Sequence, residues 1–141
     1  MRKGVNREMY LTADQLKEVL QSGMIWQGSK SSTNASTTYS KYFNKDGSLV
    51  MITRAGQFNK KVGISTGSYK IINKGGAGYL LVTYNKISQN HPKTSRFNSD
   101  NKDAYAVNTV ITTGPYKRVN SMTYSYTNDL GDTKTFAKRE K

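Results

Sequence analysis

The sequence predicts a mainly β protein, in which about eight strands form an antiparallel up-and-down meander that closes into a barrel, with one α-helix near the N-terminus. Three observations carry this prediction. Residues with β-branched or aromatic side chains are frequent from Met24 onward. Turn-forming residues recur there at intervals of about ten. One segment with helical spacing and clear end signals precedes them, at residues 12–22.

Residues 12–22 carry the start and stop signals of a short helix. Thr12 can cap the N-terminus, and Gln15 three residues later completes a capping box. Gly23 is a natural stop. One face bears an apolar stripe formed by Leu16, Val19 and Leu20. Such a short helix must pack on something else, so we expect it to cover the sheet. We expect residues 1–11 to be a flexible lead-in and residues 12–141 a single domain.

The rest of the chain divides into strand-like runs separated by turns. Asp46-Gly47 is a strong signal for a two-residue hairpin. Short connections make neighbouring strands antiparallel, and closing the meander into a barrel removes its exposed edges. An open sandwich is the alternative architecture. The predicted strands are residues 24–32, 37–44, 48–54, 66–73, 79–86, 104–112, 116–127 and 132–139.

The chain is strongly basic. It has 22 Lys and Arg residues against 9 Asp and Glu, which gives a formal net charge of +13. This excess favours an anionic partner: nucleic acid, lipid headgroups or an anionic cell-wall polymer. Solubility alone is the other explanation, because the basic residues are scattered and form no long run. The candidates for an anion-binding surface are Lys60, Lys61, Lys117 and Arg118.

Cysteine is absent, which excludes a disulfide, a thiolate metal site and a thiol nucleophile. No apolar region follows Met1-Arg2-Lys3, so we expect no signal peptide in this chain. No apolar run approaches the length of a membrane-spanning helix. We therefore expect either a cytosolic protein or a mature exported domain written without its leader.

The inventory of catalytic groups is poor. His91, the one histidine, lies in a polar Asn90-His91-Pro92 segment, and no nucleophile elbow accompanies it. The paired acids Asp100 and Asp103, like Asp129 and Asp132, fall in predicted turns, where they bond the local backbone. Neither zinc spacing nor a nucleotide-binding loop is present. The sequence therefore predicts a protein that is not an enzyme and uses no metal or cofactor.

Aromatic residues are more informative. Most of the ten tyrosines fall in predicted strands, where an apolar ring with a polar tip suits both a core and a binding site. An eight-stranded barrel is either filled by side chains or holds one small ligand. The residues predicted to face such a cavity are Tyr69, Ile71, Tyr105, Val107, Tyr124 and Tyr126.

The order of elements resembles that of the lipocalins, or calycins, and especially the small lipocalin-like domains of bacteria. The resemblance rests on the capped helix, on a first strand containing Trp26, and on the hairpin segment 42–48 followed by the Gly-x-Tyr strand 66–71. It implies that Trp26 closes the base of the barrel. It also implies that an arginine near the last strand, Arg139 or Arg118, packs over that ring.

Together these features predict a monomeric, non-catalytic binding domain, used outside the cell or at the cell surface of a Gram-positive bacterium. Its partner would be a small hydrophobic or amphipathic ligand, or an anionic envelope polymer. The alternative is a protein that binds single-stranded nucleic acid, since aromatic residues flanked by Lys and Arg can stack bases and follow phosphates.

Overall fold

The computed structural model describes residues 9–30, 36–56, 61–87, 108–128 and 131–139. Within these ranges the protein has one α-helix, α2 (Ala13–Gln21), and nine strands. The strands are β1 (Met24–Lys30), β2 (Ser36–Phe43), β3 (Ser48–Gly56), β4 (Lys61–Lys74), β5 (Ala77–Lys86), β6 (Val110–Thr113), β7 (Tyr116–Arg118), β8 (Thr123–Thr127) and β9 (Thr133–Arg139).

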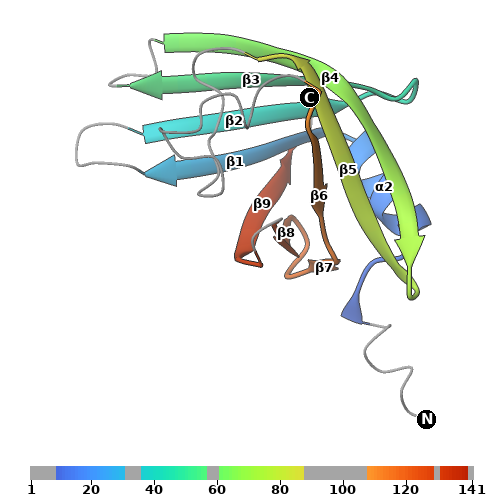
Figure 1. Ribbon diagram of the computed structural model, residues 1–141. Helices are drawn as coiled ribbons and strands as arrows, with labels where there is room; N and C mark the ends of the chain where they lie inside the picture. Colours follow the sequence, from blue (N-terminus) through green and yellow to red (C-terminus); the bar gives the residue numbers. More distant parts are fainter. Residues whose placement is uncertain (1–8, 31–35, 57–60, 88–107, 129–130, 140–141) are drawn as a thin grey trace.

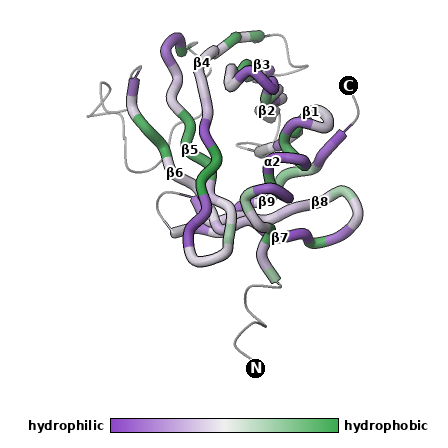
Figure 2. Tube along the Cα trace, turned by 90° about the vertical axis from the view of Figure 1, so that its right-hand side faces the viewer, coloured by the Kyte–Doolittle hydropathy of each residue, from purple (hydrophilic) through white to green (hydrophobic). Residues whose placement is uncertain are grey.

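All nine strands belong to one antiparallel sheet with the order β6-β5-β4-β3-β2-β1-β9-β8-β7. The chain runs as a meander from β1 to β6, crosses to β7, and returns through β8 and β9 to pair with the free edge of β1. Figures 1 and 2 show that the sheet curls into a half-barrel. The predicted fold class, a mainly β meander with one helix near the N-terminus, is thus confirmed.

The structure has one strand more than predicted, because residues 116–127 form two strands. The chain reverses at Asn120, whose side-chain Oδ1 accepts hydrogen bonds from the backbone N–H groups of Met122 and Thr123. An asparagine that bonds its own local backbone in this way makes a tight turn. β4 also starts earlier than predicted, at Lys61, since residues 61–65 continue the ladder with β3.

The predicted closed barrel is replaced by an open curl. The outermost strands, β6 and β7, follow each other through Gly114-Pro115, but no ladder joins them within the described residues. Part of this gap is bridged by the backbone of Leu11. It donates a hydrogen bond to the Tyr116 carbonyl at 2.8 Å and accepts one from the Gly78 N–H at 2.8 Å. Leu11, which the sequence placed in the lead-in, therefore links β5 to β7.

Helix α2 begins as predicted. The Thr12 side chain accepts a hydrogen bond from the Gln15 N–H, and the Gln15 side chain accepts one from the Thr12 N–H. Leu16 and Leu20 on the apolar stripe are buried. No helix in the described part of the chain is long and apolar enough to cross a membrane.

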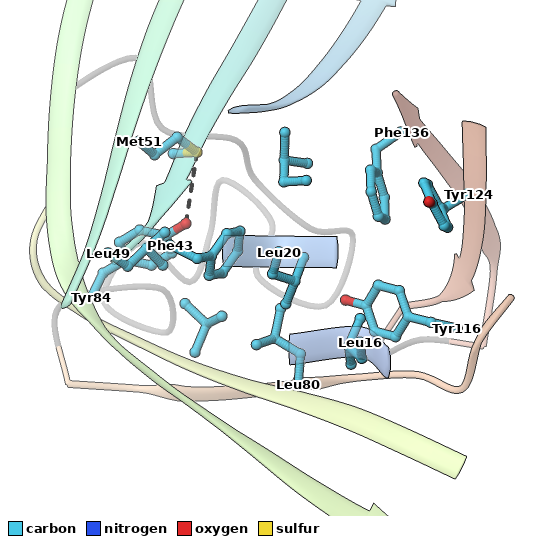
Figure 3. Close-up of a cluster of buried hydrophobic side chains, with 12 residues drawn as sticks. Leu16, Leu20, Phe43, Leu49, Met51, Leu80, Tyr84, Tyr116, Tyr124 and Phe136 are labelled. Atoms are coloured by element: carbon cyan, nitrogen blue, oxygen red, sulfur yellow. Dashed lines mark hydrogen bonds between the residues drawn. The ribbon is translucent and has the colours of Figure 1, made fainter. Parts of the chain in front are cut away.

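The core lies between α2 and the concave face of the sheet. Figure 3 shows Leu16 and Leu20 between two groups of side chains, one from β2, β3 and β5 and one from β7, β8 and β9. The first group includes Phe43, Leu49, Met51 and Tyr84, and the second consists of Tyr116, Tyr124 and Phe136. The helix therefore packs between two arms of the sheet, which strand pairing joins through β1 and β9.

Leu20→Ala should lower the free energy of unfolding by about 2–5 kcal/mol, because it removes a fully buried side chain from this junction. Lys17→Ala, on the exposed side of the same helix, should change it by less than about 0.5 kcal/mol. Urea unfolding of both variants measures the difference. Equal effects of the two substitutions would contradict this account of the core.

Candidate functional site

Four of the six predicted cavity residues lie within the described ranges, and all four pack into the core. Tyr69 and Ile71 on β4 and Tyr126 on β8 are partly buried against the core cluster, and Tyr124 is fully part of it. Tyr105 and Val107 fall outside the described residues. The end of the half-barrel that α2 covers is therefore filled by the very side chains that were expected to line a cavity.

The contacts of these tyrosines explain why they pack so firmly. The Tyr69 ring meets Phe43 edge-on at 5.0 Å, while its hydroxyl accepts from Gln21 Nε2 and donates to the Asn44 carbonyl, both at 2.6 Å. Tyr126 stacks on Tyr116 at 5.0 Å between ring centroids. Tyr124 stacks on Phe136 at 5.4 Å. Such aromatic pairs add to the stability of the core beyond the area they bury.

The predicted anion-binding residues do not form one cluster in the described structure. Lys117 and Arg118 lie on β7, and Arg118 donates a hydrogen bond from Nε to the Asn120 carbonyl at 3.1 Å. Lys60 falls outside the described residues, and of Lys61 only the backbone is described. Tyr116, which precedes Lys117, is 3% exposed and so cannot stack on a nucleic-acid base.

Trp26 lies on the convex face of the sheet. Its neighbour Ile25 is buried in the core, so the next side chain along the strand points the opposite way. The Arg139 guanidinium lies 4.4 Å from the centroid of the Trp26 ring, a cation–π contact that the resemblance had placed at Arg139 or Arg118. The ring extends over Gly28, where a Cβ would approach it to 2.7 Å. Trp26 thus packs on the outside of the sheet, away from the base of the core.

The charge of the sheet has one sign. None of the chain's nine Asp and Glu residues falls in a strand that the structure describes, whereas every strand except β6 and β8 contains Lys or Arg. The four described carboxylates belong to Asp14, Glu18, Asp46 and Asp132, and all of them are exposed outside the strands. The sheet is therefore suited to an anionic partner on either face.

One of these basic residues, Lys41, points toward the core side, and sequence reasoning missed it. Direct cross-strand partners share a face of the sheet. Lys41 on β2 is paired with Ile25 on β1 and with Met51 on β3, both of which are buried in the core. Lys41 therefore lies on the concave face, with part of its surface still accessible.

The environment of Lys41 disfavours its positive charge. Burial lowers the pKa of Lys41 from 10.5 to about 8, because a charged ammonium loses hydration in this position. Lys138 lies on the same face, because it is paired with Ile25. Its ammonium has a partner: Nζ donates a hydrogen bond at 2.9 Å to Oγ of Ser22, the residue after α2. No described carboxylate is placed to neutralise Lys41.

Polar groups continue beyond Lys41 on the concave face. Tyr39 lies two residues along the same strand and is paired with Thr53 on β3. Burial raises the pKa of Tyr39. Gln27 is paired with Tyr39 and bonds the Tyr126 hydroxyl at 3.1 Å. Thr53 is fully buried, and its Oγ1 has no hydrogen-bond partner among the described residues. The concave face thus changes from apolar near α2 to polar around Lys41, Tyr39, Thr53 and Gln27.

A signal for this polar group was present in the sequence. Tyr39, Lys41 and Phe43 alternate along one strand, so they share a face, and Phe43 is clearly a core residue. A lysine that alternates with core residues on the same face of a strand is unusual, because lysine is almost never buried without a partner. Of the charged groups considered for catalysis, His91, Asp100, Asp103 and Asp129 lie outside the described residues. No three His, Asp or Glu side chains within the described ranges could hold a metal ion.

The sequence matches no family model, and no curated protein matches it significantly. The lipocalin-like resemblance therefore stays a prediction, and the function has to be argued from the structure of this chain.

Lys41→Met should raise the free energy of unfolding by about 1 kcal/mol at pH 7, because it removes a poorly solvated charge while keeping the length of the side chain. Between pH 8 and 10.5 the unfolded chain binds a proton at Lys41 that the folded protein does not, so the wild type gains stability with rising pH. The variant lacks this gain. Its advantage should therefore shrink between pH 7 and pH 9, which urea unfolding at the two values will measure. An advantage independent of pH would show that Lys41 is well solvated.

Proposed function

We propose that the protein is a non-catalytic binding domain that takes a small amphipathic molecule with an anionic group on the concave face of its sheet. The observation that carries the proposal is Lys41, a partly buried lysine beside core residues whose ammonium group is poorly hydrated. A buried charge is costly unless it is paired. An anionic ligand would supply the partner that the described part of the chain does not.

The concave face matches both halves of such a ligand. Ile25 and Met51 flank Lys41 within the apolar core, where they are 4% and 0% exposed, so an apolar tail would lie along the edge of the core beside them. Tyr39 and Gln27 carry polar groups on the other side of Lys41, toward which an acidic head would point. Thr53 Oγ1 adds a buried hydroxyl without a partner among the described residues. Ligand sites combine an apolar surface with a few placed polar groups in this manner.

The alternative, single-stranded nucleic acid, has less support. Stacking of bases requires exposed aromatic faces next to basic residues. Tyr116, beside Lys117 and Arg118, is buried, and of the tyrosines predicted to line the interior, Tyr69, Tyr124 and Tyr126 pack in the core. The described strands contain no acidic residue, which favours any anionic polymer. The nucleic-acid hypothesis therefore predicts that an oligonucleotide binds with a steep dependence on salt.

The cell-envelope setting and the lipocalin-like kinship are part of the same proposal. The net charge of +13 and the absence of cysteine support a place near anionic wall polymers or lipid headgroups. The stacking of Arg139 on Trp26 supports the kinship.

Titration calorimetry tests the proposal with decanoate and decyl phosphate below their micelle concentrations and with decanol below its solubility limit. The two anions should bind the wild type, whereas decanol, which has the same tail without a charge, should bind at least about tenfold more weakly. Lys41→Met should weaken binding of the anions by a similar factor. Binding should also fall from pH 7 to pH 9.5 as Lys41 loses its proton.

Lys45→Met is the matched control, since Lys45 is an exposed lysine in the turn after β2. It should leave the affinity unchanged. If both lysine variants lost the same affinity for the anions, the effect would be due to net charge alone, and the proposed site at Lys41 would be wrong. Tight binding of an oligonucleotide together with no binding of either anion would move the assignment to the nucleic-acid alternative.

A further inference from the structure

The convex face of the sheet carries an apolar stripe that nothing in the function proposed above uses. Alternate residues of four neighbouring strands point to this side, opposite the core. Cross-strand pairing aligns Ile64 with Ile52, and Thr66 with Val50. It further aligns Ile52 with Ser40 and Ser40 with Trp26, so the aligned residues run from β4 to β1. We name as the convex stripe Met24, Trp26, Tyr42, Val50, Ile52, Val62 and Ile64.

The stripe is continuous and uncovered at one end. Ser40 in its middle is only 8% exposed, although it faces outward, because the larger side chains around it shield it. The Tyr42 hydroxyl bonds Met24 Sδ at 3.2 Å, which ties β2 to β1 on this side. Val62 and Ile64 on β4 remain 54% and 53% exposed. Exposed aliphatic side chains in line with Ile52 and, three strands away on β1, with Trp26 are characteristic of a contact surface.

Positive charges frame the convex stripe. Arg54 is paired with Val62, and Arg139 is paired with Met24 and covers Trp26. Lys86 at the end of β5 is paired with Thr66. All three are exposed, and the strands beneath them contain no acidic residue. The surface therefore combines apolar side chains with cations, and none of the described strands that form it contains an acidic residue.

We propose that the convex stripe docks on an anionic lipid surface. Trp and Tyr favour the boundary between water and lipid, aliphatic side chains gain by entering it, and arginine and lysine meet the headgroup phosphates. An anionic lipid surface can therefore interact favourably with the aromatic, aliphatic and cationic side chains of this face. The stripe lies on the opposite side of the sheet from Lys41, so the proposal does not depend on the ligand site.

Charge complementarity selects this occupant over two others. A second copy of the chain would bring Arg54, Arg139 and Lys86 against like charges, with no carboxylate on the strands to pair with them. A nucleic acid would meet the cations but gain nothing from Val62 and Ile64, because its backbone is hydrophilic. Only the lipid surface makes use of both the aliphatic and the cationic residues.

Trp26 is a fluorescent probe for testing this proposal. It is the one tryptophan of the chain, so its fluorescence reports on the convex stripe alone. The full chain is mixed with vesicles of phosphatidylcholine, with or without about one-third phosphatidylglycerol, and partitioning is also measured by sedimentation. The expected result is a blue shift of the emission and sedimentation with the anionic vesicles only, both weakened by added salt.

Val62→Ser/Ile64→Ser should lower the partition coefficient into anionic vesicles by about tenfold or more. Val110→Ser is the control, because Val110 is equally exposed, at 55%, but lies on β6 beyond β5. It should leave partitioning unchanged. Arg54→Gln should weaken binding to anionic vesicles and, like the wild type, should not sediment with neutral vesicles.

Three results would overturn the proposal. The first is no partitioning of the wild type into anionic vesicles. The second is undiminished partitioning of the double serine variant, with its circular dichroism unchanged. The third is a blue shift that appears without lipid as the protein concentration rises and disappears in the double variant, since this would assign the stripe to a second copy of the chain. Loss of the Lys41 ligand site would affect none of these readouts.

Discussion

The structure depends on the insertion of two leucines of α2 between the two arms of the sheet. Leu16 and Leu20 lie in one buried cluster, between side chains from β2, β3 and β5 on one side and from β7, β8 and β9 on the other. The arms are joined by strand pairing only through β1, and no ladder closes the curl at β6 and β7 in the described residues. Without the helix, each arm would expose its apolar face to water, which an isolated sheet of this kind cannot sustain.

The curl gives the two faces of the sheet different roles. On β1 and β2 the side chains alternate, so Ile25 and Lys41 face inward while Trp26 and Tyr42 face outward. A shift of one residue in register would exchange these sets completely. Phe43 and Ile25 fix the register, because they must be buried with the leucines of α2. The positions of both Lys41 and Trp26 therefore follow from the packing of the core.

The distribution of charge links these faces to function. Every carboxylate of the chain lies outside the described strands, so the sheet holds its lysines and arginines without internal neutralisation. On the concave face this leaves Lys41 in a poorly hydrated position with a lowered pKa. On the convex face it leaves arginines beside exposed aliphatic residues. Both arrangements are stabilised by an anionic partner with an apolar part.

The sequence by itself determined the local elements, because their signals are local. Thr12 and Gln15 fixed the start of the helix, Asp46-Gly47 marked the β2–β3 hairpin, and alternating strands with short turns predicted an antiparallel meander. The turn at Asn120 was not predicted as a break between two strands, because an Asx turn inside a β-rich segment resembles a bend within one strand. Only the tertiary structure decided that the described strands form a half-barrel, that Tyr69, Tyr124 and Tyr126 pack in the core, and that Lys41 lies in the inner row. Those outcomes depend on which distant strands become neighbours, and long-range pairing leaves no local pattern to read.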